Sequence, residues 1–205
     1  MIFRFLIILI TILPLKSFAL IEVDITRGNL NPLPMAVSPL SMDKSSKKEF
    51  KDILNQDDLG SKISEIVENN LKQSGLFNPL DKDAFLQKPD IAHLKPRFED
   101  WALIKAQALI TGKVTYADEK LRVEFRLWDV LAAKEIMALA FTTVPSNWRR
   151  VGHIITDKVY ERLTGEKGYF DTRVIYVAEE GPKTKRIKKL AIMDQDGFNT
   201  KYLTL

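Results

Sequence analysis

"LRVEFRLWDV", residues 121–130, alternates between apolar and polar side chains and is the clearest strand signal in the chain. Its apolar positions share one face with Phe125, and its charged positions share the other with Glu124. One face of the sheet is therefore expected to be buried and the other to be wet. Two similar runs flank it, "AQALITGKVTY" (106–116) and "EIMALAFTTV" (135–144), and short polar turns join the three. The pattern predicts an antiparallel meander.

Two amphipathic helices are predicted to pack on this sheet. The run "SNWRRVGHIITDKVYERLTG" (146–165) follows the meander, repeats apolar side chains at helical spacing and ends at Gly165. An earlier run, "SKISEIVENNLKQSG" (61–75), has Ser61 as its N-cap and Gly75 as its stop. Sheet and helices together predict a two-layer domain of the α/β (α+β) class.

Shorter elements complete this domain, which we expect to span residues 34–168. Residues 34–40 form a short apolar run bounded by prolines, as a strand would be. The polar residues 41–52 are interpreted as a loop running into a helix. We expect a brief strand or turn at 76–81 and a short helix within 96–104.

After Gly168 the pattern changes to short alternating runs separated by tight turns, with no helix. Residues 169–205 therefore predict a small antiparallel sheet, too small to be stable by itself. The loop "DQDGFN" (194–199) imitates the start of a calcium loop but lacks the later acidic ligand, so we expect a turn with Gly197 at positive φ. The basic residues within 183–189 are an anion patch or, more simply, protection of a sheet edge.

The first residues have the form of an export signal. Arg4 precedes the apolar run 5–15, and the small residues Ser17 and Ala19 stand where a signal peptidase reads. We predict a signal peptide that ends at Ala19, with cleavage before Leu20. An uncleaved membrane anchor is the alternative, but the run is shorter than the roughly 20 residues that span a bilayer.

The predicted export signal and the composition both indicate a periplasmic protein. The sequence has no cysteine, so it has neither a disulfide nor a lipidation site after the signal. The most direct expectation is a soluble periplasmic protein. Its 31 basic and 27 acidic residues are intermixed, and the net charge is +4. A surface of this kind favours acidic proteins or an anionic envelope over nucleic acid as partner.

The usual signatures of catalysis are missing from the sequence. It has no G-x-S-x-G elbow, no complete phosphate-binding loop around Gly112 and no cysteine nucleophile. The two histidines, His93 and His153, are far apart and belong to no metal-binding pattern. We expect His153, near the apolar face of its helix, to be a hydrogen-bonded structural residue. No cofactor and no metal are therefore predicted, and the chain is interpreted as non-enzymatic.

Three stretches resemble the TolB family of periplasmic Tol-Pal proteins. They are "ISEIVENNLKQSGLFNPLD" (63–81), "WRRVGHIITDKVYERLTGEKGYFDTRVIYV" (148–177) and "MDQDGFN" (193–199). The resemblance implies two long helices on a five-stranded mixed sheet, followed by a β-propeller. Residues 169–205 would then be its first blade. A propeller needs at least about four blades to close, so we expect a fragment or the product of a shortened gene.

The resemblance also implies partners. In the family, the mature N-terminus binds the C-terminal domain of TolA, and the propeller binds the peptidoglycan-associated lipoprotein Pal. The matching stretch here is Leu20 to about Asn31, within a predicted flexible partner-binding segment of residues 20–33. It is a strand-like run next to a Gly, Asn and Pro tether. The predicted TolA-binding residues are Leu20, Ile21, Glu22, Val23, Asp24, Ile25, Thr26, Arg27 and Gly28.

Two other functions stay open at this stage. One is an exported hydrolase whose active site lies on further propeller blades, since propellers also host enzymes. The other is a nucleic-acid-binding module, suggested by the basic charge and weakened by export.

Overall fold

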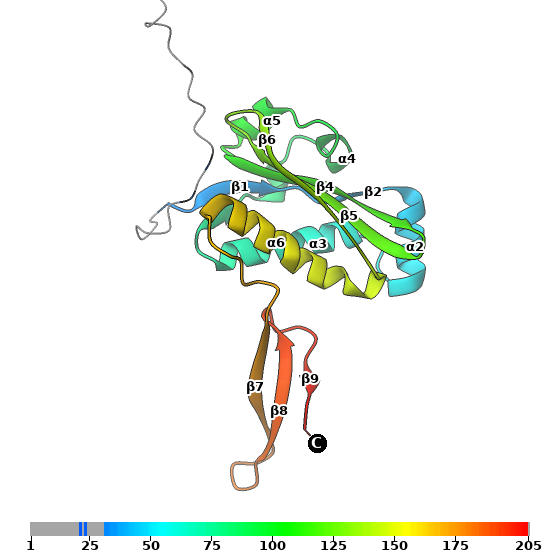
Figure 1. Ribbon diagram of the computed structural model, residues 1–205, viewed down its shortest axis with the longest axis vertical. Coiled ribbons are helices and arrows are strands. Elements are labelled where there is room, and N and C mark those ends of the chain that lie inside the picture. The colour runs from blue at the N-terminus through cyan, green and yellow to red at the C-terminus, as the bar shows by residue number, and fades with distance from the viewer. Residues whose placement is uncertain (1–20, 22, 24–30, 205) are drawn as a thin grey trace, which may run out of the picture.

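The computed structural model describes Ile21, Val23 and residues 31–204. It consists of an α/β domain and, below it in Figure 1, a separate antiparallel sheet. The sheet of the domain has the order β3-β1-β4-β5-β6, and β2 pairs with β4 beside this path. Its strands are β1 (Leu33–Val37), β2 (Ser41–Met42), β3 (Phe77–Pro79), β4 (Ala108–Ala117), β5 (Lys120–Asp129) and β6 (Lys134–Thr143).

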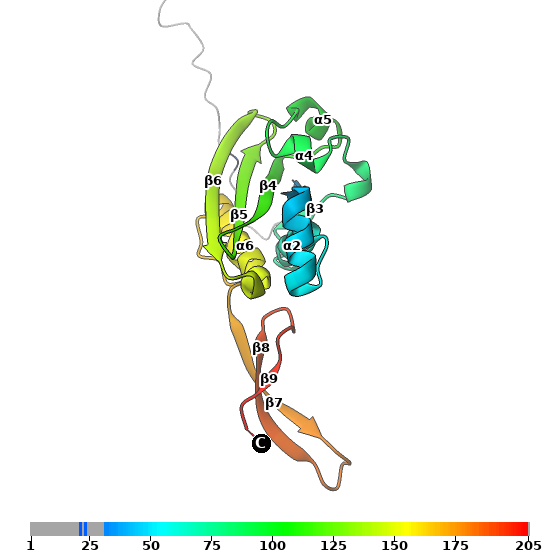
Figure 2. The same ribbon diagram turned by 90° about the vertical axis from the view of Figure 1, so that its right-hand side faces the viewer.

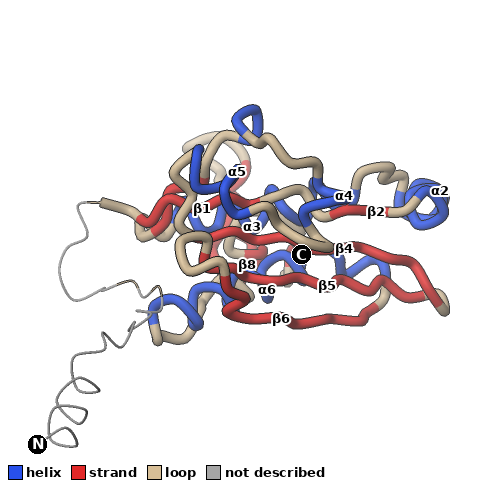
Figure 3. Tube along the Cα trace, turned by 90° about the horizontal axis from the view of Figure 1, so that it is seen from above, coloured by secondary structure: helices blue, strands red, loops and turns tan. Residues whose placement is uncertain are grey.

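The antiparallel meander is confirmed. Strands β4, β5 and β6 pair antiparallel in sequence order and run side by side in Figure 3. Asp118 and Glu119 form the β4–β5 turn, both at positive φ, the backbone of a two-residue hairpin that matches the strand twist. Strand β1 pairs in parallel with β3 and β4, so the sheet is mixed as expected. The five-stranded path is the predicted one, and the two-residue β2 adds a short sixth strand.

Both predicted long helices are present and pack against each other on one face of the sheet. They are α3 (Leu59–Gln73) and α6 (Trp148–Thr164) (Figure 1). Apolar side chains from both helices and from β5 form the main core. A Cβ at Gly152 would come within 2.9 Å of the Ile66 side chain, so this glycine lets α6 approach α3 closely. At 17 residues, α6 is the longest helix of the described chain.

The segment expected to be a loop running into a helix is mostly helical. Helix α2 (Lys44–Leu54) begins directly after Asp43, whose carboxylate accepts a hydrogen bond of 2.8 Å from the Ser46 backbone N–H. This bond is the main reason why the pKa of Asp43 lies below its ordinary value. Phe50 is fully buried and its ring meets Tyr116 edge to face. The N-cap, the buried Phe50 and the bond from the Tyr116 N–H to the Ser46 hydroxyl at 2.9 Å together dock this charged helix.

The opposite face of the sheet is wet only in part. Arg122 and Glu124 of β5 are exposed, as the alternation predicts. The end of the sheet near Leu109 is instead covered by a short layer built from η1 (Lys82–Ala84), α4 (Pro89–Ala92) and α5 (Phe98–Leu103). Trp101 is buried there, and its indole N–H donates to the Gln87 side chain at 3.1 Å. This layer forms a second, smaller core.

The C-terminal sheet consists of β7 (Arg173–Glu180), β8 (Ile187–Asp194) and β9 (Lys201–Tyr202), antiparallel in that order, as predicted. Figure 2 shows it extending away from the α/β domain. Its basic run makes cross-strand ion pairs, of Arg186 and Lys188 with Glu179 and of Lys189 with Glu180. In the described part of the chain, no helix is long and apolar enough to cross a bilayer.

Candidate functional site

The predicted TolA-binding segment is described at two positions, Ile21 and Val23. Its other residues lie outside the described part of the chain: Leu20, Glu22, Asp24, Ile25, Thr26, Arg27 and Gly28. The predicted signal peptide and its cleavage after Ala19 lie there as well.

Val23 lies against the C-terminal end of α6. Val23 is 5% exposed, and its N–H donates to the Leu163 carbonyl at 2.8 Å. That carbonyl is available because the last carbonyls of a helix have no partner within it, and α6 ends at Gly165 with φ 76°. Ile21 packs against the same core from its edge. Ile21 and Val23 are therefore both docked on the α/β domain.

A second candidate site lies where α6 meets the C-terminal sheet. Residues 165–172, which we call the linker, fold back along α6. The Asp157 carboxylate accepts hydrogen bonds from the backbone N–H groups of Phe170 (2.7 Å) and Asp171 (3.1 Å). Phe170 is buried against Tyr160, with ring centroids 5.7 Å apart. A Cβ at Gly168 would lie 2.5 Å from the Asp157 Cα, so this close approach requires glycine.

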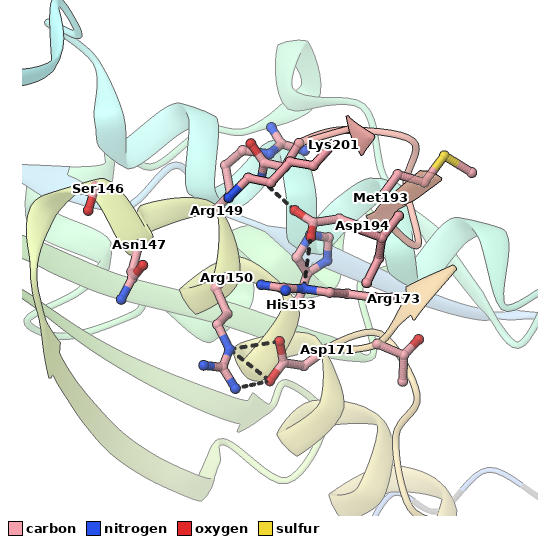
Figure 4. A pocket seen from close by; sticks show the side chains of 13 residues that line it. Ser146, Asn147, Arg149, Arg150, His153, Asp171, Arg173, Met193, Asp194 and Lys201 are labelled. Carbon is pink, nitrogen blue, oxygen red and sulfur yellow. Dashed lines mark hydrogen bonds and ion pairs between the residues drawn. The ribbon is translucent and has the colours of Figure 1, made fainter. Parts of the chain in front are cut away.

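Two arginines at the N-terminal end of α6 connect the helix to the linker and to the β8–β9 turn, residues 194–199. Arg150 makes three hydrogen bonds of 3.0–3.1 Å with the Asp171 carboxylate, which raise its pKa (Figure 4). Arg149 forms an ion pair with Asp196, and its guanidinium lies over the Phe198 ring, 3.8 Å from the centroid. Both charges are thereby used in holding the two parts of the chain together.

A buried amide completes this contact. Asn70 of α3 is 1% exposed, and its Nδ2 lies 2.9 Å from His153 Nδ1 and 3.2 Å from Thr156 Oγ1, both on α6. Its Oδ1 accepts a hydrogen bond of 2.8 Å from the Gln195 side chain in the turn. One side chain thus links α3, α6 and the β8–β9 turn. We call the polar contacts around Asn70, Arg149 and Arg150 the joint.

His153 is buried at the centre of the joint. Only 2% of the residue is exposed, and Nδ1 is bonded to Asn70, so the predicted structural, hydrogen-bonded histidine is confirmed. Its Nε2 has no hydrogen-bond partner and lies 3.5 Å from the Asp196 carboxylate. Burial lowers the pKa of His153 below its ordinary value, and the attraction of Asp196 opposes this only in part.

A pocket of about 590 Å³ opens beside His153, between the start of α6 and the C-terminal sheet (Figure 4). Ligand atoms of His153, Asp194 and Asp196 lie within 4.8 Å of one another, close enough to hold a metal ion. However, Asp196 is already paired with Arg149, and Arg173 lies 3.8 Å from Asp194. Because both carboxylates have a cationic partner, we assign the cluster to the ion network of the joint and no metal to it.

The turn itself is as predicted. Gly197 has φ 86°, and its N–H donates to the Asp194 carbonyl at 2.9 Å. Local sequence patterns contain no sign that Asp196 meets Arg149 and His153, because α6 and the turn are far apart along the chain. Asn70 was missed for the same reason. The one available signal was that Arg149, Arg150 and His153 lie close together near the start of a helix whose other face belongs to the core.

Comparison with known proteins places the chain in a family. The model of the TolB amino-terminal domain matches residues 21–136. The chain belongs to the TolB family. The Tol-Pal system protein TolB of Pelagibacter ubique (strain HTCC1062) is 83% identical to it over all 205 residues. The chain spans 46% of the length of that TolB relative.

A solved structure supports the fold. The crystal structure of TolB from Acinetobacter baumannii matches 85% of this chain with a TM-score of 0.68 and 23% sequence identity. The match covers 39% of the A. baumannii TolB chain. At this identity the likeness bears on the fold alone, and it agrees with the mixed α/β domain and the antiparallel C-terminal sheet described above.

Proposed function

We propose that this TolB-family chain is a non-enzymatic adaptor of a Tol-Pal cell-envelope system, located in the periplasm. The observation that carries the proposal is the 83% identity, over the whole chain, to a protein named for that system. The predicted signal peptide supports the location. In this role the protein contributes to outer-membrane integrity, to cell division and to protein import.

TolA is the proposed partner of the N-terminal segment. Residues Leu20 to Gly28 carry the strand-like alternation that β-augmentation uses, in which backbone groups pair with the edge of another sheet. The contact at Val23 supports this reading, because its backbone N–H already pairs with a carbonyl at the end of α6, the same kind of bond that the edge of a partner's sheet would offer. A partner that binds only the released segment would shift the population away from the docked state.

Pal is the proposed partner of a β-propeller of which the C-terminal sheet is the first blade. Several large apolar side chains of this sheet are exposed, namely Val174, Ile175, Val177, Ile187 and Leu190. Blades of a propeller bury such side chains against their neighbours. Through Pal, the protein would be peripheral to the outer membrane.

The proposal is tested by calorimetry with the TolA C-terminal domain. The intact mature chain is expected to bind, and a chain lacking residues 20–31 is expected to show no measurable binding. Because Val23 is buried, the deletion also lowers stability slightly, so its folding is checked by circular dichroism. A deletion variant that is folded and binds with unchanged affinity would contradict the proposal.

A peptide separates binding from folding. The synthetic segment "LIEVDITRGNLN" (20–31) is expected to bind the TolA domain, and a scrambled peptide of the same composition is the matched control. Equal binding of the two peptides, or binding of neither, would remove the assignment of TolA to this segment.

A further inference from the structure

The hydrogen bonds around Asn70 have a fixed direction. Thr156 Oγ1 donates to the Gly152 carbonyl at 2.9 Å, so it must accept from the Asn70 amide nitrogen. The same nitrogen faces His153 Nδ1, and the Asn70 oxygen accepts from Gln195. An amide nitrogen only donates, so Nδ1 is the acceptor and the neutral imidazole carries its proton on Nε2.

A second proton on His153 conflicts with this arrangement. It would sit on Nδ1 and point at the Asn70 amide nitrogen, so that two donors face each other at 2.9 Å. The conflict is relieved if the Asn70 side chain turns over and offers its oxygen to Nδ1. That oxygen is the acceptor for Gln195, whose bond ties the β8–β9 turn to α3.

We propose that protonation of His153 breaks the bond between Asn70 and Gln195 and so loosens the β8–β9 turn from α3, while Arg149 still holds the turn to α6. The joint between the α/β domain and the C-terminal sheet therefore weakens as the pH falls. The inference concerns this chain alone and requires neither TolA nor Pal. The group that takes up the proton is His153, which is buried and whose Nε2 has no hydrogen-bond partner and lies 3.5 Å from Asp196 in the turn.

The charged groups around His153 set the direction of the effect. Asp194 and Asp196 from the turn and Asp171 from the linker favour the protonated ring, whereas Arg149 on α6 and burial oppose it. Burial is the largest of these, so the pKa of His153 is lower in the closed joint than in an open one.

The sign follows by linkage. An exposed histidine has a pKa of about 6.5, so above that pH the ring is neutral in both states and the joint has its full strength. As the pH falls from there towards the lower pKa of the closed joint, the open state takes up the proton first. The closed joint weakens over this interval, by about tenfold in its equilibrium constant for each unit between the two pKa values.

NMR titration of the unsubstituted protein is the first test. The chain has two histidines, so the ring signal of His153 is assigned by comparison with a His93→Gln variant. We expect the pKa of His153 in the folded protein to lie below its value in urea. A value equal to or above the urea value would overturn the inference, and this measurement needs no variant of His153 to fold.

Hydrogen exchange of the turn is the second test. Exchange rates of the amides in residues 194–199 are corrected for their intrinsic pH dependence, which leaves the opening equilibrium of the turn. This opening equilibrium is expected to increase as the pH is lowered from 7.5 to 5.5. The upper bound of the increase is about tenfold for each unit by which the pKa of His153 is lower in the closed joint than in the open one. His153→Gln should make the opening independent of pH, and the matched control His93→Gln should leave the dependence in place. Equal pH dependence in both variants would overturn the inference.

A third variant tests the role of Asn70 directly. In Asn70→Asp the carboxylate accepts from Nδ1–H, so the donor conflict disappears and a negative charge is added. We expect the pKa of His153 to rise above its urea value and the pH dependence of opening to reverse. An unchanged pKa in folded Asn70→Asp would show that the amide does not couple His153 to the turn.

Discussion

The β4–β5 hairpin of the α/β domain and the β7–β8 hairpin of the C-terminal sheet have the same kind of sequence and different surroundings. In β5, alternate residues from Leu121 to Leu127 are fully buried beneath α3 and α6. In the C-terminal sheet, whose strands are all described, Ala191 is the one buried residue. Alternation therefore specifies strands and their pairing, whereas burial requires a second layer that covers one face.

The largest effect is expected where that second layer is present. Phe125 is 1% exposed and stacks on Phe141, so Phe125→Ala should lower the free energy of unfolding by about 3–5 kcal/mol. Ile175 of β7 is 61% exposed, so Ile175→Ala should change the free energy of unfolding by less than about 0.5 kcal/mol. Urea unfolding of both variants measures the difference. Similar losses would mean that the C-terminal sheet has a core of its own.

The next effect concerns the joint between the two regions. Asn70→Ala removes the side chain that His153 Nδ1, Thr156 and Gln195 are bonded to. The variant is expected to lose about 1–3 kcal/mol of the free energy of unfolding, because buried polar groups are left without this partner. Gln195→Ala removes only the bond between Gln195 and Asn70 and is expected to cost less in the same urea experiment. Asn69→Ala, at an exposed position, is the control and should be neutral. A larger loss from Gln195→Ala would place most of the stability of the joint in the turn.

A smaller loss than at Phe125 or Asn70 is expected at the glycine where the α/β domain passes into the linker. Gly165 has φ 76° and no atom within 4 Å of an added Cβ, so Gly165→Ala should cost about 1–2 kcal/mol from backbone conformation alone. Gly75 ends α3 with φ 72° and the same open space, so Gly75→Ala is a matched control. Thermal unfolding compares the two. A clearly larger loss at Gly165 would show that the linker geometry also stabilises the molecule.

Local signals predicted most of the fold. The meander and both long helices follow from side-chain periodicity, and the ends at Gly75 and Gly165 follow from the left-handed backbone that glycine adopts. The turn at Gly197 was found in the same way. The predicted helix start was less close, because Asp58 rather than Ser61 caps α3.

The layer around Trp101 and most of the joint were not predictable in this way. Trp101 was placed in a short helix, but its burial depends on Gln87, which satisfies the indole N–H from a neighbouring loop. At the joint, Arg149 looks like a solvated helix residue until Asp196 is brought beside it. Contacts of this kind have no periodicity, because they join residues that the chain separates by many positions.

The sequence by itself determined the main helices and strands, their order and the resemblance to the TolB family, and it predicted the export signal. Each of these depends on residues that are neighbours along the chain. The tertiary structure alone decided which polar groups meet. It placed Val23 on the end of α6 and left His153 buried with one nitrogen bonded to Asn70 and the other facing the turn. The physical reason is that a buried hydrogen bond or ion pair depends on distance and direction, which only the packing of α3, α6 and the turn supplies.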